Sequence, residues 1–198
     1  MAELQLYYYK KVREIDFMAY NANEVALWIL TEAKRQGILM THMKLQKLLY
    51  YAQAYSIAMT GKPLFTNDIQ AWKHGPVIPD VYHSFSKYGN STIADFQDAV
   101  IPENWTALIS ALIHDKGYMT AYELSDMTHR EPTWINARNN PAQNTITVDM
   151  LSDFFTQDFW ASDEEDEYQP VFNSIEEEKK YFRSTITEEE RNAILASR

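Results

Sequence analysis

The chain has no cysteine. This absence excludes disulfide scaffolds, thiolate nucleophiles, iron–sulfur clusters and cysteine-ligated zinc together. It is compatible with a reducing compartment. The N-terminus also lacks a basic segment followed by an apolar one. We therefore expect a cytoplasmic protein.

Glycine is scarce, with five residues in a chain of 198, and no two of them lie closer than 14 positions. A phosphate-binding loop needs several glycines within one turn, because backbone N–H groups must approach the anion. The sequence therefore holds no Walker or dinucleotide-binding fingerprint. It also lacks a G-x-S-x-G elbow and an H-E-x-x-H pair.

Long hydrophobic runs and dense basic clusters are missing as well. The longest apolar run covers residues 25–30, whereas a membrane-spanning helix needs about 20 residues. The densest basic cluster is Lys10, Lys11 and Arg13, in a chain with a net charge of −10. An acidic chain without a basic face repels phosphate backbones. We expect neither a membrane span nor direct nucleic-acid binding.

A change in charge along the sequence divides the chain into a body and an acidic extension. Residues 161–198 hold 11 acidic and 5 basic residues, a net charge of −6, and the switch falls in the acidic run 162–167. Such runs are usually solvated linkers or interaction tails. We predict an N-terminal segment at 1–19, a helical domain at 20–160 and an acidic extension at 161–198.

The central domain is predicted to be mainly α-helical. Apolar residues repeat with a helical period over residues 23–35 and 41–59, and Thr41 is a natural N-cap for the second helix. Further helices are predicted after Pro79, from 102 to 117, from the capping box at Thr120 and from Thr147. Residues 69–73 alternate as a strand does, and residues 74–77 are predicted to form a turn. The fold expected is a compact helical domain with a small strand or hairpin element near residues 64–77.

Three segments then resemble a known family. They are Met43-Lys44-Leu45-Gln46-Lys47-Leu48-Leu49-Tyr50-Tyr51-Ala52, then Pro63-Leu64-Phe65 with residues 71–82 (AWKHGPVIPDVY), and Thr128-His129-Arg130-Glu131-Pro132-Thr133-Trp134. In this order they resemble the Panacea domain, the SocA-like antitoxin family that also occurs in phages and prophages. The resemblance covers roughly residues 20–158.

The resemblance implies a mostly helical fold with a small strand element and no catalytic residues. It also implies a partner, a toxin encoded beside the antitoxin that the domain neutralises by direct binding. One alternative is an adaptor that delivers its partner to a protease, as one family member does. Another is a helical hydrolase, for which Ser125, Asp126 and His129 are the candidate residues. No oxyanion-forming turn accompanies them.

The chemistry of the residues in the second segment also indicates a structural role. Gly75 permits backbone geometries closed to other residues, Pro76 fixes the next φ angle, and Pro79 can open a helix. We predict a rigid corner built by these three residues, and a corner of the same kind on the C-terminal side that His129 and Trp134 brace. The alternative role for the corner is direct contact with a partner.

Candidate partner-binding residues fall in two groups. In the domain they are Trp72, His74, Tyr82, His129 and Trp134. In the acidic extension they are Tyr168, Phe172, Tyr181 and Phe182. The extension is either a plain solvated end or a partner-binding segment whose carboxylates imitate phosphate. The five histidines show no metal-ligand spacing, so no metal or other cofactor is expected.

Overall fold

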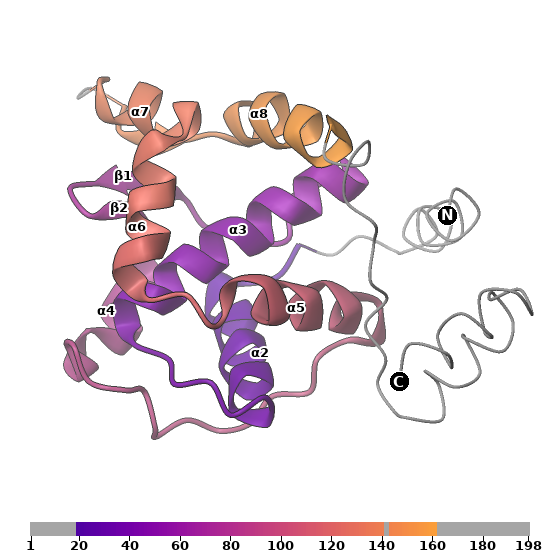
Figure 1. The fold of residues 1–198 in the computed structure, drawn as a ribbon, viewed down its shortest axis with the longest axis vertical. Coiled ribbons are helices and arrows are strands. Elements are labelled where there is room, and N and C mark those ends of the chain that lie inside the picture. The colour runs from indigo at the N-terminus through magenta and orange to yellow at the C-terminus, as the bar shows by residue number, and fades with distance from the viewer. Residues whose placement is uncertain (1–18, 141–142, 162–198) are drawn as a thin grey trace, which may run out of the picture. The chain divides into compact units, whose positions relative to one another are not determined.

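The computed structural model describes residues 19–140 and 143–161. Seven α-helices and a small antiparallel sheet make up this part of the chain (Figure 1). The helices are α2 (Ala22–Arg35), α3 (His42–Thr60), α4 (Pro79–Phe85), α5 (Glu103–Lys116), α6 (Ala121–Arg130), α7 (Pro132–Arg138) and α8 (Val148–Ala161). The strands are β1 (Ile69–Trp72), β2 (Gly75–Val77) and β3 (Thr145–Ile146), and a 3-10 turn covers Ser86–Tyr88. The mainly α fold with a small β element is confirmed.

Helix α3 runs through the middle of the described part, and α2, α5, α6, α8 and β2 all pack against it (Figure 1). Thr41 begins it, because its Oγ1 accepts a hydrogen bond from the backbone N–H of Lys44. Gly61 ends it in the left-handed conformation, with φ of 70°. Nearly every side chain from His42 to Ala58 is buried. The helix is therefore the core element on which the other elements are placed.

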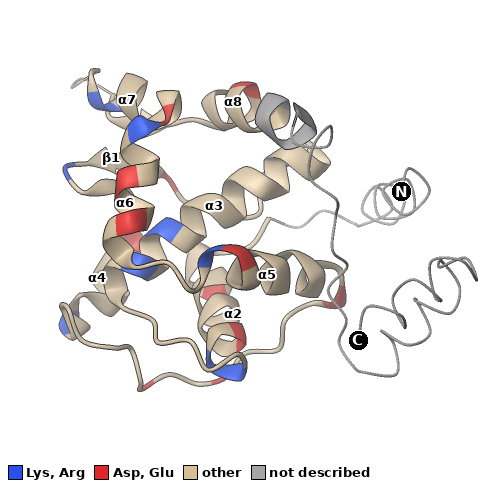
Figure 2. Cartoon of the chain, viewed as in Figure 1, with Lys and Arg blue, Asp and Glu red and all other residues tan. Residues whose placement is uncertain are grey.

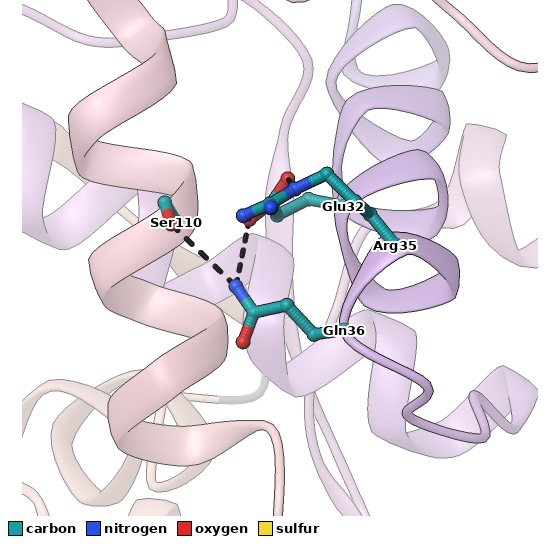
Figure 3. Close-up of polar contacts among 4 residues, drawn as sticks. All are labelled: Glu32, Arg35, Gln36 and Ser110. Atoms are coloured by element: carbon teal, nitrogen blue, oxygen red, sulfur yellow. Dashed lines mark hydrogen bonds and ion pairs between the residues drawn. The ribbon is translucent and has the colours of Figure 1, made fainter. Parts of the chain in front are cut away.

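A polar contact joins α2 to α5 at the rim of the core (Figure 3). The carboxylate of Glu32 accepts from Arg35 at 2.6 and 2.7 Å and from Gln36 Nε2 at 2.7 Å. The same Gln36 nitrogen reaches the hydroxyl of Ser110 on α5 at 3.5 Å. Because Glu32 is almost fully buried, these donors compensate its loss of hydration.

The sheet has the strand order β2–β1–β3, with both pairings antiparallel. Residues 74–77 were predicted to form a turn, and this prediction is right for His74 and wrong for residues 75–77. The turn is Lys73–His74, and residues 75–77 form β2. The reason is that Pro76 lies on an edge strand, where its missing N–H removes no ladder bond. Gly75 pairs with Trp72 directly after the turn.

Several short signals predicted helix ends correctly, but two elements were missed. Thr120 and Glu123 form the predicted capping box of α6, and Thr147 caps α8. Pro132 follows the end of α6 and begins α7, since proline is well suited to the first helical position. The two residues of β3 carried too little pattern to be predicted.

Other predictions lie outside the described residues. They concern the segment 1–18 with its basic cluster, and the acidic extension with Tyr168, Phe172, Tyr181 and Phe182. The three-part division of the chain stays a prediction for the same reason. Within the described residues, no helix combines the length and the apolar character needed to cross a bilayer.

Candidate functional site

Helix α3 holds the β1–β2 hairpin through two adjacent polar side chains. Lys47 Nζ donates to the carbonyl oxygen of Pro76 at 2.9 Å. Gln46 Oε1 accepts from the backbone N–H of Ile78 at 2.8 Å. Both side chains are almost fully buried. The strand β2 is thus fixed to the core helix by hydrogen bonds that water does not compete for.

Gly75 is required at this contact for two independent reasons. Its φ of +99° lies in the region that favours glycine. A Cβ atom there would also stand 2.7 Å from Lys47 Cε and Nζ and 2.8 Å from Thr128 Oγ1. The lysine therefore reaches Pro76 only because the residue beside it has no side chain.

Lys47 sets the electrostatics of the region. Burial lowers the pKa of its amine from 10.5 to about 7, because the charged form loses its hydration. Burial also lowers the pKa of His42 and of His129, and the nearby Lys47 charge adds to both effects. Positive charge is therefore disfavoured behind the hairpin.

Helices α6 and α7 hold the other side of the hairpin. Ser125 Oγ on α6 donates to the carbonyl oxygen of His74 at 3.1 Å. Trp134 Nε1 on α7 donates to the carbonyl oxygen of Trp72 at 3.0 Å. The ring of Trp134 also packs on His129, with the ring centroids 4.2 Å apart. Both ends of the hairpin turn are therefore tied to helices distant in the sequence.

The five candidate residues of the domain all come to this corner. Trp72 and Tyr82 pack together with ring centroids 4.9 Å apart, and Trp134 and His129 lie on the other side of the Trp72 backbone. His74 is in the exposed turn, whereas the other four side chains are half-buried. We call Trp72, His74, Tyr82, His129 and Trp134 the hairpin face.

The members of the hairpin face differ in what they offer a partner. The two indoles and the Tyr82 ring are large apolar groups that remain partly exposed. The imidazole of His129 packs on Trp134, and its Nε2 is buried without a hydrogen-bond partner among the described residues. This nitrogen therefore offers little to a partner. The side chain of His74 is exposed in the turn. The chemistry available is therefore aromatic contact with a polar rim.

Residues outside the predicted set turn out to position this face. Glu131, between α6 and α7, accepts hydrogen bonds from the hydroxyls of Tyr50 and Tyr51 on α3, the latter at 2.8 Å. Tyr50 also shares a hydrogen bond with Thr133 at 2.7 Å. Burial and the carboxylate together raise the pKa of both tyrosines, so both stay protonated donors. The sequence offered two signals for this network. One is a charged residue directly before a proline, and the other is a pair of tyrosines in an apolar helix.

Ser125 and His129, two candidate residues of the hydrolase alternative, make structural contacts at this corner. The Ser125 hydroxyl donates to the His74 carbonyl, and the His129 ring packs on Trp134. Among residues 19–140 and 143–161, no three metal-ligating side chains gather into one group. The geometry of this corner thus describes a braced aromatic surface.

Comparison with known proteins bears on the same region. Residues 45–135 match the family model described as "Antitoxin SocA-like, Panacea domain". These residues include most of α3, the hairpin and every member of the hairpin face. The chain is also 39% identical over 74 residues to a protein named "Antitoxin SocA" from Caulobacter vibrioides (strain NA1000 / CB15N).

The alignment with that relative has limited extent. It covers 37% of this chain and 39% of the relative's length. No solved structure matches the chain. The resemblance inferred from three sequence segments is nevertheless confirmed over the region that builds the corner: residues 45–135 match the Panacea domain of SocA-like antitoxins.

Proposed function

We propose that this protein is an antitoxin that neutralises a toxin by direct protein–protein binding, and that the hairpin face makes the contact. The observation that carries the proposal is the position of the face. All five of its residues lie within the matched region 45–135, and all five gather at one corner of the fold.

The way the corner is held supports this use. Lys47, Ser125 and Trp134 each donate a hydrogen bond to a different carbonyl of the hairpin. A surface that is rigid before binding loses little conformational entropy on association. Partly exposed tryptophan and tyrosine are also the side chains most enriched at binding hot spots. Neutralisation then follows from occlusion of the toxin's own functional surface, with no bond made or broken.

Co-expression with the protein encoded beside this one tests the proposal. We expect the neighbour to arrest growth alone, to be silenced by this chain and to co-purify with it. The double variant His74→Ala with Tyr82→Ala should lose both effects. A matched control is His114→Ala with Tyr122→Ala, which removes the same residue types from exposed positions on α5 and α6.

Three results would contradict the proposal. The neighbour could be harmless alone, or it could stay toxic in the presence of this chain. The toxin's half-life could also fall when this chain is present, which would indicate delivery to a protease in place of inhibition. The unfolding midpoint of each variant must be measured, because a loss of binding is informative only where the fold is retained.

A further inference from the structure

Basic side chains flank the hairpin face, although the chain as a whole is acidic. Lys73 lies in the hairpin turn, Arg130 ends α6 and Arg138 ends α7, and all three are exposed. Figure 2 shows basic residues in blue at the hairpin and at both ends of α7. Within the part of the chain that the structure describes, none of the three forms an ion pair.

The fold brings one of these cations and one indole to the same strand, and a second cation follows the other indole in the chain. Arg138 and Trp134 lie one turn apart on α7 and both donate to β1, at 3.4 Å to the Ala71 carbonyl and 3.0 Å to the Trp72 carbonyl. Lys73 directly follows Trp72 in the chain. Cations and aromatic rings are thus held together on one corner.

The nearby carboxylates do not cancel this charge. Glu131 is buried and its oxygens accept from Tyr50 and Tyr51, so it faces the core. Asp126 on α6 is exposed and is the opposing charge that α6 brings near His129. Asp80 at the start of α4 accepts a hydrogen bond from Asn67. Three exposed cations therefore stand against two exposed carboxylates at this corner, those of Asp126 and Asp80, because a neutral amide donor leaves the Asp80 charge in place.

We propose that the hairpin face receives an acidic segment of the partner protein, with carboxylates against Lys73, Arg130 and Arg138 and an apolar or aromatic side chain against the two indoles. This acidic-segment proposal rests on the proposed function in one respect, namely that the chain acts by binding a protein. Complementary charge at the rim of an aromatic surface increases the association rate and fixes the register of the bound segment.

A nucleic acid would also present negative charge, but it fits this corner less well. The chain carries a net charge of −10. A long polyanion extends past the corner over the acidic remainder of the surface, whereas a short peptide stays within about one Debye length of the local cations. The surface therefore favours a short acidic peptide segment.

The test uses a fluorescent peptide that alternates Glu with Tyr, and a second peptide in which every Glu is replaced by Gln. We expect the Glu peptide to bind the full chain at least about tenfold more tightly at low salt, and the difference to vanish at high salt. Lys73→Glu should weaken the Glu peptide by at least about threefold. Lys87→Glu, in the exposed turn after α4, makes the same change of charge away from the hairpin and should have no effect.

The possible results separate the hypotheses. Equal binding of the two peptides, or no difference between the Lys73 and Lys87 variants, would overturn the acidic-segment proposal. Tighter binding of oligo-dT than of the Glu peptide would overturn it in favour of a nucleic acid. Neither result depends on whether a toxin is silenced in co-expression, so the proposed function can stand or fail separately.

Discussion

The substitution Lys47→Met tests whether burial of the Lys47 amine lowers its pKa and destabilises the folded protein. Methionine has a similar length and no charge, so it fills the same space. Lowering the pKa of Lys47 from 10.5 to about 7 corresponds to about 5 kcal/mol of unfavourable free energy when the amine is charged in both folded and unfolded chains. This is the cost of removing an ammonium from water where one carbonyl, that of Pro76, accepts from it.

The direction of the pH dependence follows from proton linkage. Between pH 7 and pH 10.5 the unfolded chain still holds a proton that the folded chain has released. The free energy of unfolding must therefore rise with pH in this window. For a pKa of about 7, the expected gain between pH 7 and pH 9 is about 2 kcal/mol. Below pH 7 the destabilisation by Lys47 is complete and constant.

Other titrating groups do not hide the effect. The lowered pKa values of His42 and His129 act below pH 6.5, and the raised values of Tyr50 and Tyr51 act near pH 10 and above. Lys44 also has a lowered pKa and contributes with the same sign. The difference between wild type and Lys47→Met cancels the contributions of Lys44 and the tyrosines. Those of His42 and His129 depend in part on the Lys47 charge, but they act below the pH range of the measurement.

Urea unfolding followed by tryptophan fluorescence at pH 7, 8 and 9 measures the effect. We expect the free energy of unfolding of the wild type to approach or cross that of Lys47→Met as the pH rises, with equal m-values. Lys87→Met, at an exposed position, should follow the wild type. Parallel pH profiles for wild type and Lys47→Met would refute the reasoning, because Lys47 would then keep its ordinary pKa in the folded protein.

Three further substitutions probe the same corner, each by urea unfolding. Gly75→Ala should lower the free energy of unfolding by about 3 kcal/mol, because it adds both strain and a clash. Gly61→Ala, whose backbone is left-handed with φ of +70° and has open space around it, should lower it by about 1 kcal/mol; equal losses would show that the contact with Lys47 is unimportant. Glu131→Ala leaves the hydroxyls of Tyr50 and Tyr51 without their acceptor and should cost about 3 kcal/mol, so a neutral result would mean that water replaces the carboxylate. Trp134→Phe removes the bond to the Trp72 carbonyl and should cost about 1 kcal/mol, and full stability would show that the indole N–H does not hold the hairpin.

Local signals allowed much of the helical framework to be predicted. Thr41, Gly61 and Thr120 act through hydrogen bonds or backbone angles within a few residues of themselves, so their roles can be read along the chain. The hairpin shows the limit of such reading. Pro76 looks like a turn residue in isolation, and only its position at the sheet edge makes it a strand residue.

The motif residues of the candidate face were visible in the sequence, but their supports were not. Trp72 and Trp134 stand out by residue type and spacing, whereas Lys47 and Glu131 look like ordinary charged residues on helical segments. The hydrogen bond from Lys47 to Pro76 spans 29 positions, and that from Tyr51 to Glu131 spans 80. No local pattern encodes such partners, because they are chosen by the packing of whole elements.

The sequence by itself determined the helical class, most helix ends and the family to which residues 45–135 are matched, since caps, apolar period and motif spacing are properties of neighbouring residues. Only the tertiary structure decided that Trp72 and Trp134 share one corner, that Gly75 makes room for a buried amine, and that Arg138 and Trp134 both donate to β1. The physical reason is that burial and long-range hydrogen bonding depend on which elements meet around α3. The pKa of an ionisable group depends on the groups that this packing places around it.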